Sequence, residues 1–379
     1  MAERKQESDI PGGGLKTTPL NAFHREQGAR MVDFAGWDMP VQYTGILEEH
    51  RAVRESAGLF DVSHMGEFTV AGPGAAGFLD SVLTNDISKI SEGRAQYNLM
   101  CRPDGGVVDD LIVYRTGPEA FLLCVNASNA TKDFAWLEGH VGDHDCSLRD
   151  DSSRYGLLAL QGPAAETILK PLTRAVLDHL PSFGLEESSV AGWDVIISRT
   201  GYTGEPGFEL FTPWNNTEPL ARALCEAGAD HGPRLAGLGA RDSLRLEAGF
   251  PLYGHELSEE ITPIQAGLGW AVKVKKKTDF IGRDALRREK ESGPARRVVF
   301  FRTGNRRILR QGTPLLAAGR EAGQVLSGTL SPMLNEAIGS ALIESAAAEA
   351  GELSAELRGK SFPLQLVKPP FYTSAHQKT

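Results

Sequence analysis

Two adjacent aspartates, Asp109 and Asp110, interrupt an otherwise apolar run at positions 107–113. The run has the composition of a strand, in which neighbouring side chains point to opposite faces. Asp109 then shares a face with Val107, and Asp110 shares the other face with Val108. An unpaired carboxylate in apolar surroundings costs several kcal/mol. Each aspartate therefore requires a partner, solvent or a chemical role, and a pair of hairpin caps after the preceding glycine turn is the plain alternative.

A third carboxylate, Glu209, lies between Phe208 and Leu210, directly after the glycine-rich segment 198–207. The glycines suit a tight connection between strands, because glycine adopts positive φ without steric cost. A tight connection does not explain a carboxylate among apolar side chains. A carboxylate can accept two parallel N–H bonds from a planar heterocycle that carries an amidine-like edge, and pterins have such an edge. A plain turn and a heterocycle site are both open interpretations of these residues.

The segment 241–249 has the pattern of a helix closed by Gly249. Asp242 and Arg245 can pair three residues apart, which is worth only a few tenths of a kcal/mol. Arg241 is then free to contact an anion or another acceptor. A solvated helix face is the alternative.

Four further motifs have plainer interpretations. The GxGxxG pattern at 72–77 indicates a turn before a helix rather than a dinucleotide site, because a proline stands in the turn and the next strands form a turn-linked pair. The lysine run 275–277 is interpreted as a charged loop. Histidines and acids at 140–146 are spaced too irregularly for metal ligands, and we predict no metal. Ala-Gly-Trp-Asp occurs at 35–38 and 191–194, which we attribute to chance.

Composition limits the class of protein. The chain has 379 residues, 41% of them hydrophobic, with a net charge of −9, which indicates two to three domains and argues against a nucleic-acid binder. No apolar run reaches the ~18 residues of a membrane helix, so no membrane partner is expected. Four scattered cysteines favour a reducing, cytoplasmic setting. Residues 1–16 are interpreted as a flexible leader.

The elements that must position these residues alternate between helices and turn-linked strands, which predicts an α+β fold with a partly antiparallel sheet. Helices are expected at 18–28, 48–57, 75–83, 131–140, 164–169, 218–227 and 240–248, the one at 131–140 capped by Ser128 and Asn129. Strands are expected at 67–70, 95–101, 107–115, 120–125, 156–160, 193–198 and 208–212. Beyond residue 294, short apolar pieces between glycine and proline turns are typical of a small β barrel or jelly roll.

With these residues in view, the sequence resembles the aminomethyltransferases, the T-proteins of the glycine cleavage system, over about residues 17–372. The resemblance rests on motifs that follow one another in the same order: 34–40, 60–65, 105–110, 198–205, 239–249, 262–270 and 327–332. Two other readings are a folate-dependent demethylase or methyltransferase of the same fold and a non-catalytic iron–sulfur assembly factor. The absence of a cysteine after Cys225 counts against the assembly factor.

The resemblance implies three domains around a central channel for tetrahydrofolate. Domain 1 would comprise residues 17–61 plus 152–285, domain 2 residues 62–151 as a ferredoxin-like αβ module, and domain 3 residues 290–379 as the barrel. The implied partner is the lipoylated H-protein, whose lipoyl group carries an aminomethyl group. The implied reaction passes its methylene to tetrahydrofolate, releases ammonia and yields 5,10-methylenetetrahydrofolate with dihydrolipoyl H-protein.

The resemblance also assigns roles by motif. It implies that Asp110 is the catalytic acid and that Glu209 binds the pterin, with Tyr202 beside it. Arg241 and Arg358 correspond to folate-contacting arginines. Four further residues correspond to positions that line the folate channel: Met65, Tyr97, Asn126 and Trp270.

Overall fold

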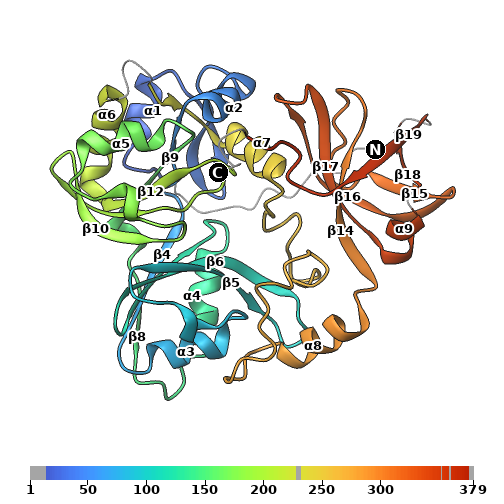
Figure 1. Cartoon of the computed structure of the whole chain (residues 1–379), viewed down its shortest axis with the longest axis horizontal. Coiled ribbons are helices and arrows are strands. Elements are labelled where there is room, and N and C mark those ends of the chain that lie inside the picture. Colours follow the sequence, from blue (N-terminus) through green and yellow to red (C-terminus); the bar gives the residue numbers. More distant parts are fainter. Residues whose placement is uncertain (1–13, 228–231, 351, 358–359, 375–379) are drawn as a thin grey trace.

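The computed structural model describes residues 14–227, 232–350, 352–357 and 360–374. Its elements form three groups around a common centre: a six-stranded sheet, a five-stranded sheet and a closed six-stranded barrel (Figure 1). Helix α7 (Leu238–Ala248) lies between the six-stranded sheet and the barrel. The predicted α+β class and the barrel are confirmed. No helix among the described residues is long and apolar enough to cross a membrane.

The six-stranded sheet has the order β10-β11-β12-β9-β3-β13 and is antiparallel except where β13 joins β3. Its strands are β3 (Gly58–Asp61), β9 (Tyr155–Gln161), β10 (Leu185–Val190), β11 (Trp193–Ser198), β12 (Gly207–Pro213) and β13 (Arg234–Leu235). The accompanying elements are α1 (Asn21–Glu26), the hairpin β1 (Arg30–Phe34) and β2 (Trp37–Gln42), α2 (Ile46–Glu55), α5 (Ala165–Leu169) and α6 (Thr217–Ala227). Apolar side chains of β9, β12, α5 and α6 share one buried core on one face of this sheet.

The five-stranded sheet has the order β5-β6-β7-β4-β8 and is antiparallel throughout. Its strands are β4 (Gly66–Ala71), β5 (Arg94–Cys101), β6 (Val107–Gly117), β7 (Ala120–Val125) and β8 (Ser147–Asp150). Helices α3 (Ala75–Val82) and α4 (Ala130–Glu138) pack their apolar residues into the core of this sheet. The predicted hairpin β5–β6 is present, and β8 was not expected.

The two sheets repeat one order of elements. Each contains a unit made of a strand, a helix, one or two short 3₁₀ turns and then three strands; the order β5-β6-β7-β4 corresponds to β10-β11-β12-β9, and β3, β8 and β13 lie outside the repeated unit. The turn after the first strand contains Gly72 in one sheet and Gly162 in the other, with φ of 129° and 128°. In each, a Cβ would come within 2.7 Å of neighbouring backbone. The predicted turn before a helix is confirmed at 72–74, where Gly72 and Gly74 also pack closely against the backbone of Asp145.

The two copies of Ala-Gly-Trp-Asp, whose recurrence we attribute to chance, have the same local structure. In both copies the Ala-Gly pair forms the two-residue turn of a hairpin, between β1 and β2 and between β10 and β11. Ala35 and Gly36 have φ of 54° and 80°, and Ala191 and Gly192 have 52° and 89°. Positive φ at both central positions matches the strand twist of such hairpins. The repeat is therefore one turn used twice, even though the two hairpins are not equivalent in the repeated topology.

The C-terminal group is a closed barrel of order β14-β17-β16-β15-β18-β19. Its strands are β14 (Arg296–Arg302), β15 (Pro314–Ala317), β16 (Arg320–Ser331), β17 (Glu336–Glu344), β18 (Leu353–Leu357) and β19 (Lys360–Val367). Helix α8 (Arg283–Ser292) precedes the barrel and α9 (Ser345–Ala350) follows β17. The chain after β19 returns to α7, where a Cβ on Gly249 (φ 82°) would lie 2.2 Å from Pro369.

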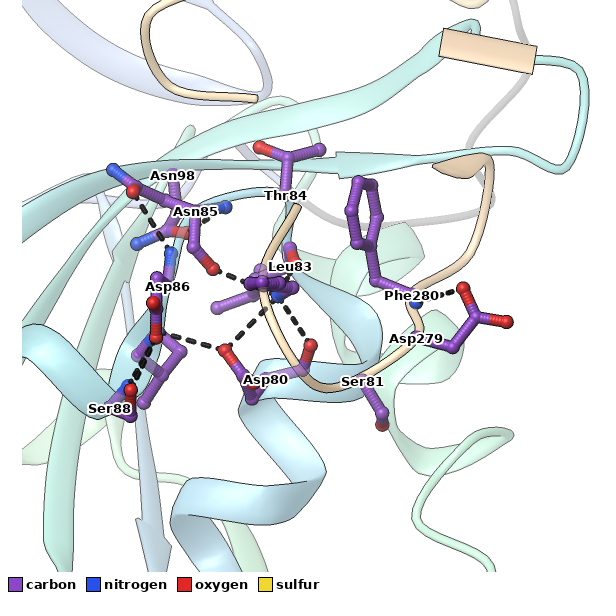
Figure 2. A network of polar contacts seen from close by, with 12 residues as sticks. Asp80, Ser81, Leu83, Thr84, Asn85, Asp86, Ser88, Asn98, Asp279 and Phe280 are labelled. Atoms are coloured by element: carbon purple, nitrogen blue, oxygen red, sulfur yellow. Dashed lines mark hydrogen bonds and ion pairs between the residues drawn. The ribbon is translucent and has the colours of Figure 1, made fainter. Parts of the chain in front are cut away.

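The lysine run 275–277 is not simply a charged loop, because Lys276 is only 6% exposed. Its ammonium donates to the carbonyl oxygens of Asp80, Leu83 and Asn85 at 2.5, 2.7 and 2.9 Å and to the Asp80 carboxylate at 3.1 Å. These acceptors lie in the last turn of α3 and in the turn that follows it, whose polar network Figure 2 shows. Lys276 thus ties the segment before α8 to the five-stranded sheet.

The division into three domains at the stated residue limits stays a prediction. The sheets and the barrel fall within the expected ranges, but Lys16, assigned to the leader, already pairs with the β1–β2 turn through its backbone (2.9 Å from the Lys16 nitrogen to the Gly36 oxygen). Residues 1–13 of that leader lie outside the described residues.

Candidate active site

A cavity of about 1010 Å³ lies where the two sheets, α7 and the barrel meet; we call it the central cavity. Eight of the nine residues singled out in the sequence line it: Met65, Tyr97, Asp110, Asn126, Tyr202, Glu209, Arg241 and Trp270. The ninth, Arg358, lies outside the described residues. Residues from separate elements along more than half of the chain therefore converge on one space.

Asp110 projects from β6 into the central cavity and is half-buried. Its carboxylate accepts a hydrogen bond from the Tyr97 hydroxyl at 2.9 Å and one from the Asn126 amide at 2.9 Å. Burial, reinforced by the neighbouring Asp109 carboxylate, raises the pKa of Asp110 to about 7. A carboxyl with this pKa can gain or lose a proton near neutral pH, which suits acid–base chemistry.

Asp109 points away from the cavity and is fully buried. Its carboxylate accepts from the Asn126 amide at 2.9 Å, from the Asn129 amide at 2.7 Å and from the Asn126 backbone N–H at 3.1 Å. Asn126 thus bridges both aspartates. Asn129 stands at the start of α4, but its side chain binds Asp109 instead of capping the helix as predicted. Burial raises the pKa of the adjacent Asp133 to about 11, so this third carboxyl is protonated at neutral pH.

A β-bulge changes the predicted faces of β6. The register shifts opposite Met100 and Cys101, so that Cys101 pairs with Val107 and Met100 with Asp109. Val108 consequently packs in the same core as Met100, whereas Val107 packs with Cys101. Strict alternation had placed Val107 on the face of Asp109 and Val108 on that of Asp110, which is wrong because the bulge inserts one residue. The alternation from Asp109 onward is kept.

Glu209 reaches the central cavity from β12 of the other sheet. Its carboxylate accepts hydrogen bonds from the Thr200 hydroxyl at 2.5 Å and from the Tyr114 hydroxyl at 3.3 Å. Tyr114 belongs to β6, so this contact joins the two sheets. An ionised carboxylate has about four lone-pair positions, and the two hydroxyls leave acceptor capacity facing the cavity. Glu209 can therefore receive N–H donors from a bound molecule.

Tyr202 and Arg241 form one aromatic and cationic wall. The guanidinium of Arg241 lies 4.6 Å from the centroid of the Tyr202 ring, and Phe250 stacks on the same ring at 5.9 Å. The Tyr202 hydroxyl donates to the carbonyl of Pro251, and burial raises the pKa of Tyr202. Within the described part of the chain, the Arg241 guanidinium makes no ion pair. This wall can hold a planar ring and an acceptor group.

The next arginine of α7 contradicts the solvated-face interpretation. Arg245 is only 1% exposed and pairs with Glu256 at 2.8 Å, with Asp242 at 2.9 Å and with the Ser327 hydroxyl at 2.8 Å. Ser327 belongs to β16, so a buried hydrogen bond from Arg245 connects α7 to the barrel. The predicted pairing of Arg245 with Asp242 is present, but its role is to hold α7, and with it Arg241, in place.

The mouth of the central cavity is aromatic. The rings of Tyr97 and Trp270 lie 5.6 Å apart at an angle of 30°, and Trp270 is 57% exposed. Sequence reasoning missed several lining residues, among them Tyr114, Thr200 and Phe250. Thr200 could have been identified from the sequence, because it lies inside the glycine-rich segment 198–207. Strand alternation from Asp110 onward puts Tyr114 on the same face as Asp110, but nothing local in the sequence marks its contact with Glu209.

The comparisons with known proteins agree over nearly the whole chain. A family model described as the GCVT N-terminal domain matches residues 20–276, and one described as the glycine cleavage T-protein C-terminal barrel domain matches residues 296–373. The chain is 50% identical to an aminomethyltransferase of Geobacillus kaustophilus over 363 residues, covering 95% of this chain and all of the relative. It is 46% identical to an aminomethyltransferase of Bacillus subtilis, covering 94% and 99%.

Among solved structures, this fold is similar to the glycine cleavage system aminomethyltransferase T from Bartonella henselae. The TM-score is 0.88 at 36% sequence identity, and the match covers 95% of this chain and 99% of that one.

Proposed function

The chain belongs to the glycine cleavage T-protein family and is an aminomethyltransferase, and from this premise we propose that its central cavity binds tetrahydrofolate as the co-substrate. The proposal covers the complete transfer: a methylene carbon leaves a lipoyl sulfur and an ammonia nitrogen and becomes bonded to two folate nitrogens. The products are ammonia, 5,10-methylenetetrahydrofolate and the dihydrolipoyl form of the donor protein. The alternatives of a demethylase and an iron–sulfur assembly factor are not favoured by the relatives.

One observation carries the proposal: carboxylates from two different sheets face the same cavity with different surroundings. Glu209 has hydroxyl donors on part of its carboxylate and acceptor capacity left over, which suits the amidine-like edge of a pterin. Asp110 has a pKa of about 7, which suits a group that changes charge during catalysis. The volume of about 1010 Å³ is sufficient for a molecule with a bicyclic head and an extended tail.

We assign separate roles to the lining residues. Glu209 orients the pterin, and Tyr202 with Arg241 forms the wall against which it lies. Asp110 in its carboxylate form stabilises positive charge that develops as ammonia departs, and accepts or passes on a proton at its Oδ atoms. Asn126 and Tyr97 hold that carboxylate through their two hydrogen bonds. Met65 and Trp270 complete the wall, and Arg358 is proposed as a further folate contact.

The proposed donor is the lipoylated H-protein, which carries the aminomethyl group on its lipoyl arm. We propose a cytoplasmic setting, supported by the four cysteines, all of which are free thiols. No residue is assigned a part in binding a metal.

Ammonia release tests the proposal directly. The purified chain is mixed with H-protein that carries the aminomethyl group on its lipoyl arm, and ammonia is measured with and without tetrahydrofolate. We expect rapid release that depends on both the chain and the folate, with formation of methylenetetrahydrofolate in equal amount. Release that ignores the folate, or none above the rate without the chain, would contradict the proposed co-substrate. Sarcosine in place of the loaded H-protein serves as the control for a demethylase.

A further inference from the structure

A second hollow lies beside the central cavity, along the outer strand β5 of the five-stranded sheet; we call it the basic groove. Its volume is about 970 Å³, and its walls come from the turn after α3, from residues 270–276 and from α8. Trp270 lines both the basic groove and the central cavity. The two hollows therefore adjoin at one exposed indole.

The basic groove concentrates positive charge in an acidic protein. Five solvent-exposed cations line it: Lys89, Lys273, Lys275, Arg287 and Lys290. Only two acidic side chains, Asp86 and Glu291, lie in the same walls. The chain as a whole carries a net charge of −9, so this local excess of cations is the reverse of the average surface.

Only some of the cations in the groove have partners within the described part of the protein. Arg287 pairs with Asp284 at 2.8 Å, and Lys290 donates to the carbonyls of Gly269 and Val272. Within the described ranges, by contrast, no carboxylate lies at ion-pair distance from Lys273 or Lys275. These two ammonium groups face the groove without a protein counter-charge.

The backbone that presents these lysines is anchored. Lys276, next in the chain, is held by its four acceptors at the end of α3 and in the turn after it, the region that Figure 2 shows. Lys290 fixes the other side through the carbonyl groups at 269 and 272. A held backbone reduces the conformational entropy that binding an anion would cost. The groove is thus a built feature of the fold and not a loose run of lysines.

The arrangement of the lining residues gives a direction. Asp110 is hydrogen-bonded to Tyr97, the Tyr97 ring lies against Trp270, and Trp270 also lines the basic groove. Glu209 lines the same central cavity but contacts Tyr114 and Thr200 instead. A folate that places its pterin on Glu209 and its reacting nitrogens near Asp110 therefore sends its other end toward Trp270. That end is a glutamate, which in cells is extended by γ-linked glutamates with one free carboxylate each.

We propose that the basic groove binds the γ-linked polyglutamate tail of the folate, with Lys273 and Lys275 as its principal contacts. The proposal rests on the proposed function and extends it to the form of the co-substrate. A tail tethered to a bound pterin meets the lysines at high effective concentration, so even exposed ion pairs add to affinity. An acidic protein surface would also be attracted to these charges, but its binding would not require a groove that adjoins the central cavity.

Binding affinities measured with two folates test the proposal. Dissociation constants of tetrahydrofolate monoglutamate and pentaglutamate are determined for the full chain by quenching of tryptophan fluorescence. We expect the pentaglutamate to bind roughly tenfold more tightly, with an advantage that shrinks as salt is raised. In a variant carrying Lys273→Gln and Lys275→Gln, the pentaglutamate should lose most of this advantage, roughly three- to tenfold, while the monoglutamate affinity stays within twofold.

Lys277→Gln is the matched control, because Lys277 is an exposed lysine of the same run that does not line the groove. This variant should leave both affinities unchanged. If Lys277→Gln lowered the pentaglutamate affinity as much per lysine as the double variant does, general charge attraction would explain the effect and the proposal would be overturned. Equal affinity of the wild-type chain for both folates would overturn the tail site and leave the proposed function standing. Failure of either folate to bind would overturn the proposed function as well. A double variant that loses affinity only for H-protein would overturn the tail site in favour of a protein contact.

Discussion

The six-stranded and five-stranded sheets share one order of strands and helices, yet each brings a different carboxylate to the central cavity. In the five-stranded sheet the acid is Asp110 on β6, the third strand of the repeated unit; in the six-stranded sheet it is Glu209 on β12, the fourth. The equivalent strands, β11 and β7, supply no carboxylate to the cavity. The same order of strands and helices therefore presents acids from two different strand positions. This shared order alone does not determine the chemistry of the site.

The surroundings of the two acids differ as well. Asp110 stands beside a second aspartate, and burial with that neighbour raises its pKa to about 7. Glu209 instead meets two hydroxyl donors, from Thr200 and Tyr114. We infer that Asp110 acts in the chemical step and Glu209 in binding. The comparison predicts that the two acids can be separated by experiment, one affecting kcat and the other the dissociation constant.

Asp110→Asn should produce the largest effect. The amide keeps the size of the side chain but cannot carry the charge or the proton, and positioned acid–base groups contribute about 10²–10⁴-fold. We expect kcat to fall by about that factor, while the dissociation constant for tetrahydrofolate changes less than about threefold. Single-turnover ammonia release and equilibrium binding measure the two quantities.

Asp143→Asn, at an exposed loop position, is the control for this substitution and should leave kcat unchanged. Near-normal turnover in Asp110→Asn would remove Asp110 from the chemical step and end the division of roles.

Glu209→Gln should give the converse result. The substitution replaces a charged acceptor with an amide that accepts at only one atom, and hydrogen bonds to charged groups are worth about 1.5–3 kcal/mol. We expect the dissociation constant for tetrahydrofolate to rise roughly tenfold to a hundredfold, with kcat at saturation within about threefold. Glu187→Gln, an exposed change on β10 of the same sheet, is the matched control. A loss confined to kcat would reverse the assignment of the two acids.

The pH dependence of stability should also distinguish Asp110. The pKa of Asp110 is about 7 in the folded chain and about 3.9 in an unfolded one, so the folded state binds the extra proton between these values. Stability from this group is therefore present at low pH and lost as pH rises from about 4 to about 7. Asp110→Asn removes this loss. We therefore expect the gain in unfolding free energy of the variant over the wild type to be about 1–2 kcal/mol larger at pH 8 than at pH 5, a range that allows for cavity water weakening the effect. Urea unfolding of both proteins at each pH measures this difference, and an unchanged difference would show that Asp110 is not desolvated.

Much of this site could be predicted from the sequence because its signals are local. Asp110 and Glu209 were conspicuous as acids within apolar strands, and Gly249 ended α7 as expected. What could not be predicted depends on contacts between distant segments. The bulge beside Val108 is set by pairing with β5, and the burial of Lys276 is set by carbonyls almost two hundred positions earlier.

The repeated topology of the sheets was also invisible in the sequence. The two units share turn positions, such as Gly72 and Gly162, but fill their strands with different side chains. Backbone pairing tolerates such differences, because a strand needs apolar residues on a face and not particular ones. Arg245 was misjudged for a related reason: its partner Glu256 and its contact Ser327 come from other segments.

The smallest effect is expected from Tyr97→Phe, which tests how the surroundings of Asp110 set its pKa. The Tyr97 hydroxyl donates to the Asp110 carboxylate at 2.9 Å and lowers the pKa of that group. Without this donor the pKa should rise by up to about one unit. If the carboxylate form is active, kcat at pH 7 falls roughly fivefold and recovers by pH 9, so the midpoint of the pH profile moves upward. Tyr253→Phe is the matched control, because its hydroxyl contacts Lys132 and not Asp110. An unmoved midpoint in Tyr97→Phe would mean that Tyr97 serves only to stack with Trp270, and the contrast between the two acids would then rest on Asp109 and burial alone.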